Sequence, residues 1–230
     1  MDAAQESIRR DSARVADLIG RADLDSAVPG CPEWNLRQLV QHLGEVQHFW
    51  AENVMAQDAS TPWPGEVAVP ERDIELEPWL RGASTRLLSV LAGPEDAPCW
   101  TWWGEPATLG AVARHQVQEA AVHRWDAESA CGRPNPIEPE VAHDGVAEFI
   151  EIVLGTDAAG GLPSRVTLTA TDTGGHWTVG PLAGSGKGAT VEASASDLVL
   201  LLYGRLPLST GLVSGDAEVA DALFEAVSSE

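Results

Sequence analysis

Residues 108–132, TLGAVARHQVQEAAVHRWDAESACG, are the stretch that decides the fold of the first half of the chain. Thr108 is a favourable N-cap and Gly132 is a typical helix stop, so the stretch predicts one long helix. Part of its surface is apolar, as expected for a helix that packs in a bundle, through Leu109, Val112, Val117 and Val122. The same helix also carries an unusual number of ionisable residues.

These ionisable residues share one stripe. His115, Glu119 and His123 are spaced i, i+4, i+8, and each step turns about 40° on a helical wheel. Asp126 falls within about 20° of Glu119 on the same wheel. The stripe is either solvated, as is usual for an isolated Glu-x-x-x-His, or it faces inward. If it faces inward, a metal ion is the natural partner that offsets desolvation of the four groups.

A third histidine favours the inward alternative. His42 lies between apolar residues in the sequence LVQHLG of an earlier predicted helix. A lone histidine among apolar neighbours is usually a core residue bonded to a carbonyl group. Together with Glu119 and His123, however, it would complete a set of two imidazoles and one carboxylate. Three protein ligands leave a coordination position open, which is typical of catalytic rather than structural zinc sites.

Three more helices are expected before residue 108. Asn35 is a predicted N-cap, and Gln38 completes a capping box with it. Pro78 is expected in the first turn of its helix, where a missing N–H is harmless. The first helix is expected to end at about Gly20, and the second to run for about twenty residues from Asn35. The third is expected to end at about Leu91. Together with the helix of residues 108–132, they predict an antiparallel four-helix bundle.

The pattern changes after the proline-rich stretch of residues 133–139, which is typical of a linker. A fifth helix is expected over Val141 to Leu154. Alternating polar and apolar residues then predict strands over residues 165–170, 176–179 and 189–193. Ser196 is the expected cap of a short helix through Tyr203, and Asp216 that of a last helix to Val227. We therefore predict two domains, a helical bundle over residues 1–135 and a small α+β domain over residues 140–230.

The composition excludes several classes of function. The chain has 230 residues and a formal net charge of −21, which disfavours binding to nucleic acid or to anionic membrane surfaces. Three widely spaced cysteines predict no disulfide framework. The polar N-terminal residues predict no secretory signal, and no apolar run approaches the length of a membrane span. We expect a cytoplasmic protein, and its near-exclusive use of Arg over Lys is typical of a GC-rich genome.

Two motifs carry a resemblance to a known family. Residues 29–44, PGCPEWNLRQLVQHLG, and residues 114–127, RHQVQEAAVHRWDA, resemble the mycothiol-dependent maleylpyruvate isomerase family. That family has a DinB-like bundle followed by a domain similar to sterol carrier proteins. The second domain's usual pattern is matched by residues 196–205, SDLVLLLYGR, and by Gly215-Asp216. The resemblance covers nearly the whole chain.

The resemblance implies a site and a chemistry. His42, Glu119 and His123 would bind a divalent metal, zinc first, and mycothiol would be the cosubstrate. A metal-activated thiolate would then add to maleylpyruvate, an unsaturated dicarboxylate, and leave again after rotation about the carbon–carbon bond. The composition also fits an actinobacterial host, where mycothiol is the cellular thiol. Related DinB-like enzymes instead transfer the thiol to an electrophilic metabolite or toxin and keep the adduct.

Further site residues are weaker candidates. Trp102 and Trp103, with Trp100, would wall a pocket over the metal, or would serve only in packing. Arg205 would bind a substrate carboxylate, or would cap a helix end. Asp126 is expected to orient a ligand histidine or Arg124. A non-catalytic metal- or ligand-binding protein of the DinB-like class stays an alternative to either enzyme.

Overall fold

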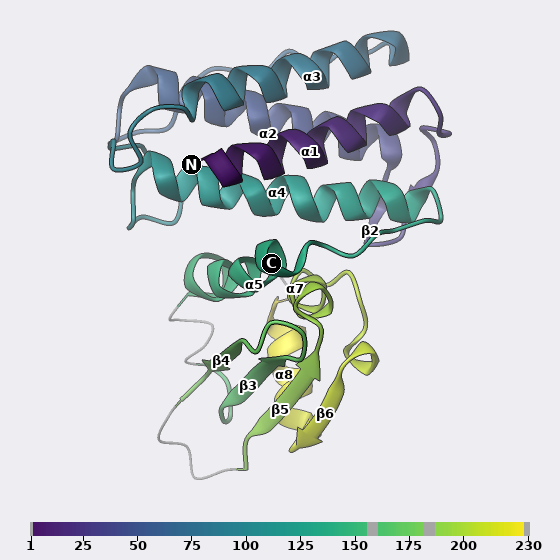
Figure 1. Ribbon diagram of the computed structural model, residues 1–230, viewed down its shortest axis with the longest axis vertical. Helices are drawn as coiled ribbons and strands as arrows, with labels where there is room; N and C mark the ends of the chain where they lie inside the picture. The colour runs from purple at the N-terminus through teal and green to yellow at the C-terminus, as the bar shows by residue number, and fades with distance from the viewer. Residues whose placement is uncertain (1, 156–160, 182–186, 228–230) are drawn as a thin grey trace. The chain divides into compact units, whose positions relative to one another are not determined.

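The computed structural model describes residues 2–155, 161–181 and 187–227. The chain divides into two compact units, Met1–Asn135 and Pro136–Glu230. The first unit is a bundle of helices and the second combines helices with a sheet (Figure 1). This confirms the predicted fold class of a four-helix bundle followed by a small α+β unit. Among the described residues, no helix has both the length and the apolar character needed to cross a bilayer.

The first unit is built from four long helices around an apolar core. Its core includes the fully buried Leu36, Leu39 and Leu43 of one helix and Leu76 and Leu80 of the next. Burial of such leucines stabilises the fold by about 1.5–3 kcal/mol for each side chain. The helices are α1 (Asp2–Ile19), α2 (Leu36–Ala56), α3 (Asp73–Val90) and α4 (Leu109–Ala130).

The helices of this bundle are not all antiparallel to their neighbours, which corrects the expectation from sequence. Arg37 pairs with Asp73 near the start of both α2 and α3, and Arg86 pairs with Glu52 near the end of both. These two helices are therefore parallel. Likewise Arg14 of α1 pairs with Glu128 of α4. About one turn earlier on each helix, Asp11 pairs with Arg124, so α1 and α4 are parallel.

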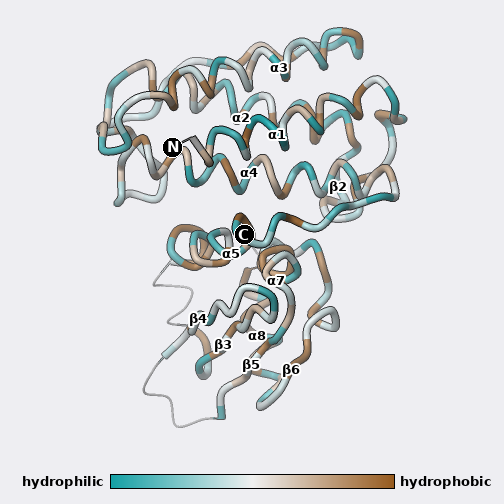
Figure 2. Tube along the Cα trace, in the orientation of Figure 1, coloured by the Kyte–Doolittle hydropathy of each residue, from teal (hydrophilic) through white to brown (hydrophobic). Residues whose placement is uncertain are grey.

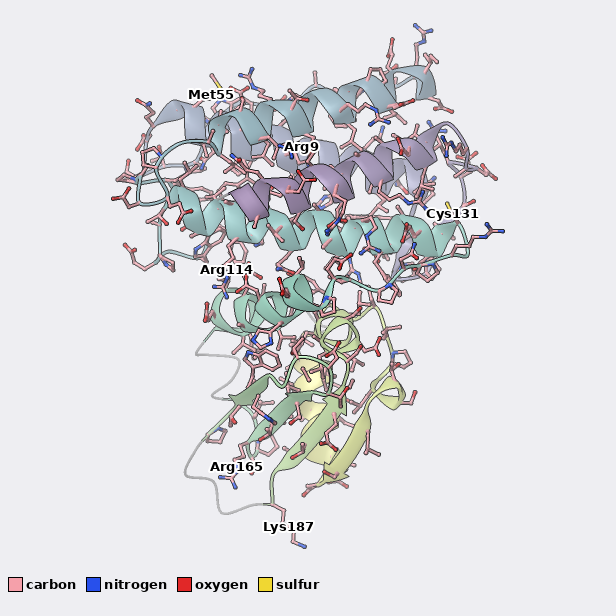
Figure 3. All side chains as sticks on the ribbon, viewed as in Figure 1. Arg9, Met55, Arg114, Cys131, Arg165 and Lys187 are labelled. Carbon is pink, nitrogen blue, oxygen red and sulfur yellow. The ribbon has the colours of Figure 1, made fainter. Side chains whose placement is uncertain are left out.

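The connection between α2 and α3 explains this order. The segment 57–72 is long enough to return along α2, and Gln41 Nε2 near the start of α2 donates a hydrogen bond to the Pro70 carbonyl (3.2 Å). By contrast, α2 and α4 run in opposite directions. Figure 3 shows this directly, because Met55 near the end of α2 and Cys131 just after α4 lie at opposite ends of the bundle. The candidate site residues come from this antiparallel pair.

Local signals fix where α2 and α4 begin. Asn35 forms the predicted capping box, in which its side chain accepts from the Gln38 N–H and the Gln38 side chain accepts from the Asn35 N–H. The Thr108 side chain accepts from the Ala111 N–H, which confirms it as the cap of α4. Such caps each stabilise a helix by about 1 kcal/mol. The segment before Asn35 contains a short ribbon of β1 (Ala27–Val28) and β2 (Cys31–Asn35).

Pro78 does not lie where the sequence predicted. It is the sixth residue of α3 rather than a member of its first turn. An amide at that position would have donated to the carbonyl of Ile74, so the helix lacks one backbone hydrogen bond there. Ile74 is 73% exposed, so water is able to satisfy that carbonyl. The close approach of α2 and α3 instead depends on Gly44, where an added Cβ would overlap the ring of Trp79.

The second unit contains a four-stranded mixed sheet. Its strand order is β4-β3-β5-β6, with β3 and β5 parallel and the outer pairs antiparallel. Leu168 of β3 pairs with Val191 of β5, and both are fully buried. The strands are β3 (Val166–Ala170), β4 (His176–Val179), β5 (Ala189–Ala193) and β6 (Leu212–Gly215).

Helices complete the second unit. They are α5 (Pro139–Glu148), the π-helical segment η1 (Phe149–Leu154), α7 (Ala195–Leu202), the 3-10 turn η2 (Leu208–Thr210) and α8 (Ala217–Val227). Helices α7 and α8 both pack on β3 and β5. Helix α7 is apolar from Leu198 to Leu202 (Figure 2), and seven of its eight residues are buried.

Three details of this unit differ from the expectation. The cap of α7 is Ser194, whose side chain accepts from the Asp197 N–H (3.0 Å), and Ser196 instead accepts from the Ile137 N–H (2.9 Å). The fifth helix begins at Pro139 and becomes π-helical from Phe149. Strand β6 was not expected, because its alternation of apolar and polar residues is short and ends in a glycine.

Candidate metal centre

The ionisable stripe of α4 lies within the bundle, on the side that meets α2. His115 and His123 are 5% and 6% exposed and Asp126 is fully buried, whereas Glu119 is partly buried. This excludes the alternative that the stripe is simply a solvated face of the helix. A group of buried charged side chains is stable only when its members satisfy one another or bind an ion.

His42 of α2 completes a cluster with two residues of this stripe. One potential ligand atom from each of His42, Glu119 and His123 lies within 4.8 Å of the other two. The imidazole centres of His42 and His123 are 5.0 Å apart and the rings meet edge to face. The donor set of two imidazoles and one carboxylate matches the composition of known catalytic zinc sites. The antiparallel pairing of α2 and α4 brings these residues together.

One carboxylate oxygen of Glu119 is suited to bind a cation. Its Oε2 is buried and forms no hydrogen bond, although His123 Nε2 lies 3.3 Å away. Its other oxygen, Oε1, lies 3.6 Å from His115 Nε2. A buried carboxylate oxygen without a hydrogen bond destabilises a protein, because carboxylate desolvation is left uncompensated. A divalent cation between Glu119 and the two imidazoles would satisfy this oxygen.

His123 is held from its other side by Asp126. The distance from His123 Nδ1 to Asp126 Oδ2 is 3.1 Å. When Nδ1 carries the proton, this contact is a hydrogen bond, and Nε2 then presents its lone pair toward Glu119. Carboxylates commonly orient metal-binding histidines in this way. The sequence left open whether Asp126 orients a histidine or Arg124, and the contact with His123 favours the histidine. Cys31, in β2, places its Sγ 3.8 Å from the same Asp126 oxygen.

The electrostatics of the cluster follow from this arrangement. Burial alone would raise the pKa of the Glu119 carboxyl, but the imidazoles of His123, His115 and His42 lower it to about 2. Burial alone would lower the pKa of His123, but Asp126 and Glu119 raise it to about 9. Without a cation, a proton on His123 therefore balances the carboxylates at neutral pH. A bound cation would take over that role and release the proton.

Aromatic rings flank the cluster along the axis of the bundle. On the Asp126 side, the ring of Trp34 lies 4.7 Å from that of His42. On the His115 side, a pocket of about 410 Å³ opens beside Glu119. Its lining residues are Glu45, Val46, Phe49, Trp50, Val67, Trp100, Trp102, His115 and Glu119.

The predicted pocket tryptophans take different places. Trp102 and Trp100 line the pocket, and Trp102 is 51% exposed. Trp103 is not among the lining residues, although its ring centre lies 5.0 Å from that of His115. Sequence reasoning missed Trp50, because its place in the pocket depends on which face of α2 meets α4. Its spacing of eight residues from His42 was the available signal, because that spacing places both residues on adjacent parts of one helix face.

Arg205 belongs to the second unit, just after α7. Its guanidinium Nη1 donates to the Tyr203 carbonyl (2.7 Å) and its backbone N–H donates to the Leu200 carbonyl (2.8 Å). Both contacts are those of an arginine at the C-terminus of a helix, where carbonyl groups lack partners. The contacts of Arg205 support the capping role that the sequence offered as one of two alternatives. Its role toward a substrate stays a prediction.

Comparisons with known proteins agree with this architecture. Residues 6–128 match the model of the mycothiol maleylpyruvate isomerase N-terminal domain, and residues 140–222 match that of the C-terminal domain of the same family. No curated protein matches the chain.

Two solved structures share the fold. One is the mycothiol-dependent maleylpyruvate isomerase, with 15% identity, and the other is a histidine-to-alanine mutant of such an isomerase, with 14% identity. Both align with a TM-score of 0.70 over 93% of this chain and 92% of theirs. The N-terminal domain model alone matches more than half of the chain, which confirms the resemblance predicted from the two motifs. The chain therefore belongs to the mycothiol-dependent maleylpyruvate isomerase family.

Proposed function

We propose that the protein is a mycothiol-dependent metalloenzyme in which His42, Glu119 and His123 bind one divalent cation. Zinc is the first candidate for this cation. The observation that carries this proposal is the approach of the three ligand atoms to within 4.8 Å, with one Glu119 oxygen buried and not hydrogen-bonded. The two isomerases that share its fold are mycothiol-dependent. A cation at such a site lowers the pKa of a thiol that binds to it, so that the thiolate forms near neutral pH.

The protein's own residues have distinct tasks in this proposal. Asp126 would keep the proton of His123 on Nδ1 and leave Nε2 to the cation. His115 lies 3.6 Å from Glu119 and lines the pocket, so it is placed to hold the proton that the thiol gives up. The aromatic rings around His115 would limit access of water to the reacting groups.

The reaction would be thiol addition of the maleylpyruvate isomerase type. A carbon–sulfur bond forms at the double bond of the substrate, and the π electron pair moves toward the conjugated carbonyl oxygen. The former double bond then rotates as a single bond. Return of the electron pair expels the thiolate and leaves the trans product, so no thiol is consumed. For a dicarboxylate substrate, Arg205 stays our candidate for binding a carboxylate.

A second candidate is an S-transferase that conjugates mycothiol to an electrophile. It begins with the same addition, but the adduct is protonated at the carbon next to the new carbon–sulfur bond and is released. One observation favours it, because no arginine or lysine is among the residues that line the pocket. With maleylpyruvate and with other electrophiles, an isomerase would leave the thiol concentration unchanged, whereas a transferase would consume one thiol for each product.

Metal analysis of protein purified without chelators tests the proposed site. We expect about one zinc per chain, and its loss in His42→Ala and in His123→Ala. His48→Ala is the matched control, because His48 lies on α2 as well but packs on Trp79 with ring centres 5.5 Å apart. Full metal content in both ligand variants would contradict the assignment. Mycothiol should also perturb the visible spectrum of cobalt-substituted protein, and an unchanged spectrum would favour a non-catalytic metal-binding protein.

A further inference from the structure

The pocket beside Glu119 is walled partly by two connecting segments of the bundle. Its volume is about 410 Å³, and it borders the candidate metal centre because Glu119 belongs to both. Among its lining residues, Val67 lies in the connection from α2 to α3, and Trp100 and Trp102 lie in the connection from α3 to α4. Connections between helices have more conformational freedom than the helices themselves. The shape of the pocket therefore depends on what holds these two segments in place.

Asn53, near the end of α2, contacts both segments. Its Oδ1 accepts a hydrogen bond from the Trp63 backbone N–H (3.1 Å), and its Nδ2 donates to the Trp100 carbonyl (3.1 Å). The same Nδ2 lies 3.5 Å from Cys99 Sγ. Asn53 is 1% exposed, so bulk water does not compete for these contacts. A donor faces Oδ1 and an acceptor faces Nδ2, which fixes the orientation of the amide.

The contact with Trp63 lies close to the pocket lining. The ring of Trp63 packs on Gly65, where an added Cβ would overlap the ring, and Val67 follows two residues later. Further along the segment, Gln41 Nε2 of α2 donates to the Pro70 carbonyl (3.2 Å). Val67 therefore lies between two attachments of its segment to α2, one of them through the side chain of residue 53.

The segment that carries the tryptophans is closed on itself. Pro98 and Thr108 form an antiparallel bridge, and the Cys99 N–H donates to the Ala107 carbonyl (3.0 Å). A loop closed at its base by backbone contacts keeps its shape when it moves. The hydrogen bond from Asn53 attaches this loop to α2.

We propose that Asn53 is a positioning residue for the candidate site, because it joins both segments to α2 and so couples one wall of the pocket to the other. Asn53 is neither a lining residue of the pocket nor one of the three candidate metal ligands. Its truncation would leave the Trp63 N–H and the Trp100 carbonyl without this partner, and both segments would open more easily. The consequence for substrate binding rests on the proposed function, but the coupling of the two segments does not.

Hydrogen exchange of the zinc-loaded protein tests the coupling without any substrate. In Asn53→Ala, the backbone N–H groups of Trp63 and Cys99 should both exchange about 10-fold faster, because local opening of each segment then breaks one hydrogen bond fewer. Asn53→Ser leaves a smaller cavity and should give the same pattern if Asn53→Ala does not fold. Unchanged rates, or faster exchange at only one of the two groups, would overturn the proposal.

Gln47→Ala is the matched control for these measurements. Gln47 is also a fully buried amide side chain of α2, but its Nε2 donates to Ser12 Oγ of α1 (2.7 Å). Its removal should destabilise the bundle while leaving the exchange rates of both segments within about 2-fold, because local opening does not require global unfolding. Equal acceleration in Gln47→Ala and Asn53→Ala would show a general loss of stability and would overturn the proposal.

Steady-state kinetics test the consequence for the site. With mycothiol as cosubstrate, zinc-loaded Asn53→Ala should show a KM for maleylpyruvate raised about 10-fold, with kcat within about 3-fold, because the pocket wall shifts while the metal ligands stay. Its zinc content should remain about one per chain, and Gln47→Ala should keep both kinetic constants within about 2-fold. An unchanged KM, or loss of zinc from folded Asn53→Ala, would contradict a positioning role. If the unsubstituted protein neither isomerises maleylpyruvate nor consumes mycothiol, the proposed function is refuted, and the exchange rates still decide the coupling.

Discussion

Glu119 and Glu128 lie on the same helix, nine residues apart, yet their surroundings differ completely. Glu128 accepts from Arg14 Nε (2.6 Å) through one oxygen, and from Arg124 Nη1 (3.0 Å) and the Asn135 backbone N–H (2.9 Å) and side chain (3.0 Å) through the other. Glu119 has histidines as neighbours and one buried oxygen without a hydrogen bond. A carboxylate saturated by donors holds helices together, whereas one left unsaturated beside imidazoles is suited to bind a cation.

Isosteric substitution of each of these two carboxylates by glutamine should give the largest difference between them. Glu128→Gln should destabilise the bundle by about 3–5 kcal/mol, because Arg124 stays buried and loses an anionic partner. Glu119→Gln should destabilise the metal-free protein less than Glu128→Gln does, because Asp126 still pairs with His123, but it should abolish metal binding. Urea denaturation followed by tryptophan fluorescence measures both, because every tryptophan except Trp177 lies in the first unit.

The metal content of the two variants tests whether the two carboxylates have separate roles. Metal content should be normal in folded Glu128→Gln protein and absent in Glu119→Gln protein. If Glu119→Gln destabilises the metal-free bundle as strongly as Glu128→Gln, then Glu119 is a structural ion-pair residue. If Glu128→Gln loses the metal while folded, the two regions are not separate.

The sequence predicts one of these two regions much better than the other. The stripe of His115, Glu119, His123 and Asp126 follows from helical periodicity alone, because all four residues lie on one helix. The Glu128 cluster was not predicted, because it depends on Arg14 and Asp11 of α1 and on the parallel packing of α1 with α4. Tertiary packing decides which helices become neighbours, and the residue pattern within one helix does not predict those neighbours.

The dependence on tertiary packing also explains other differences between the sequence-based expectations and the structure. The parallel order of α2 and α3 depends on the path of residues 57–72, and a segment of that length permits either direction. His42 was grouped with Glu119 and His123 because the three residue types form a zinc-ligand set, and the family resemblance strengthened that grouping, since periodicity does not relate two helices. Pro78 and Ser196 were misplaced by one turn or less, because several polar residues near a helix start are equally good caps.

A smaller effect should appear in the pH dependence of the metal-free protein. The pKa of His123 is raised from 6.5 to about 9 in the folded state. Its contribution to stability is therefore complete below about pH 6.5 and is lost as the pH rises toward 9, because the folded state then releases the extra proton. At about 1.4 kcal/mol for each pKa unit, the loss should not exceed about 3.5 kcal/mol.

Urea denaturation of metal-free protein between pH 6 and pH 9.5 measures this loss. His123→Gln should remove the dependence in that range, while His48→Ala should retain it. The zinc-loaded protein should show the opposite trend over the lower part of the range, because protons compete with the cation for His123. A metal-free protein whose stability is unchanged from pH 6.5 to 9 would contradict the raised pKa and the close contact of His123 with both carboxylates.

The smallest of these effects concerns Asp126, which touches the proposed ligand His123 but not the cation. Asp126→Asn should weaken zinc binding about 10- to 100-fold without abolishing it, as expected for a residue that orients a ligand histidine. Competition with a zinc chelator measures the affinity at constant pH. Asp17→Asn is the matched control, because Asp17 pairs with Arg81 of α3 and not with a residue of the cluster. An unchanged zinc affinity in Asp126→Asn, with the raised pKa of His123 intact by nuclear magnetic resonance titration of metal-free protein, would show that Glu119 alone holds this imidazole. A lower affinity with a lowered His123 pKa would place Asp126 with Glu119 among the residues that prepare α4 for a cation, in contrast to Glu128 on the same helix.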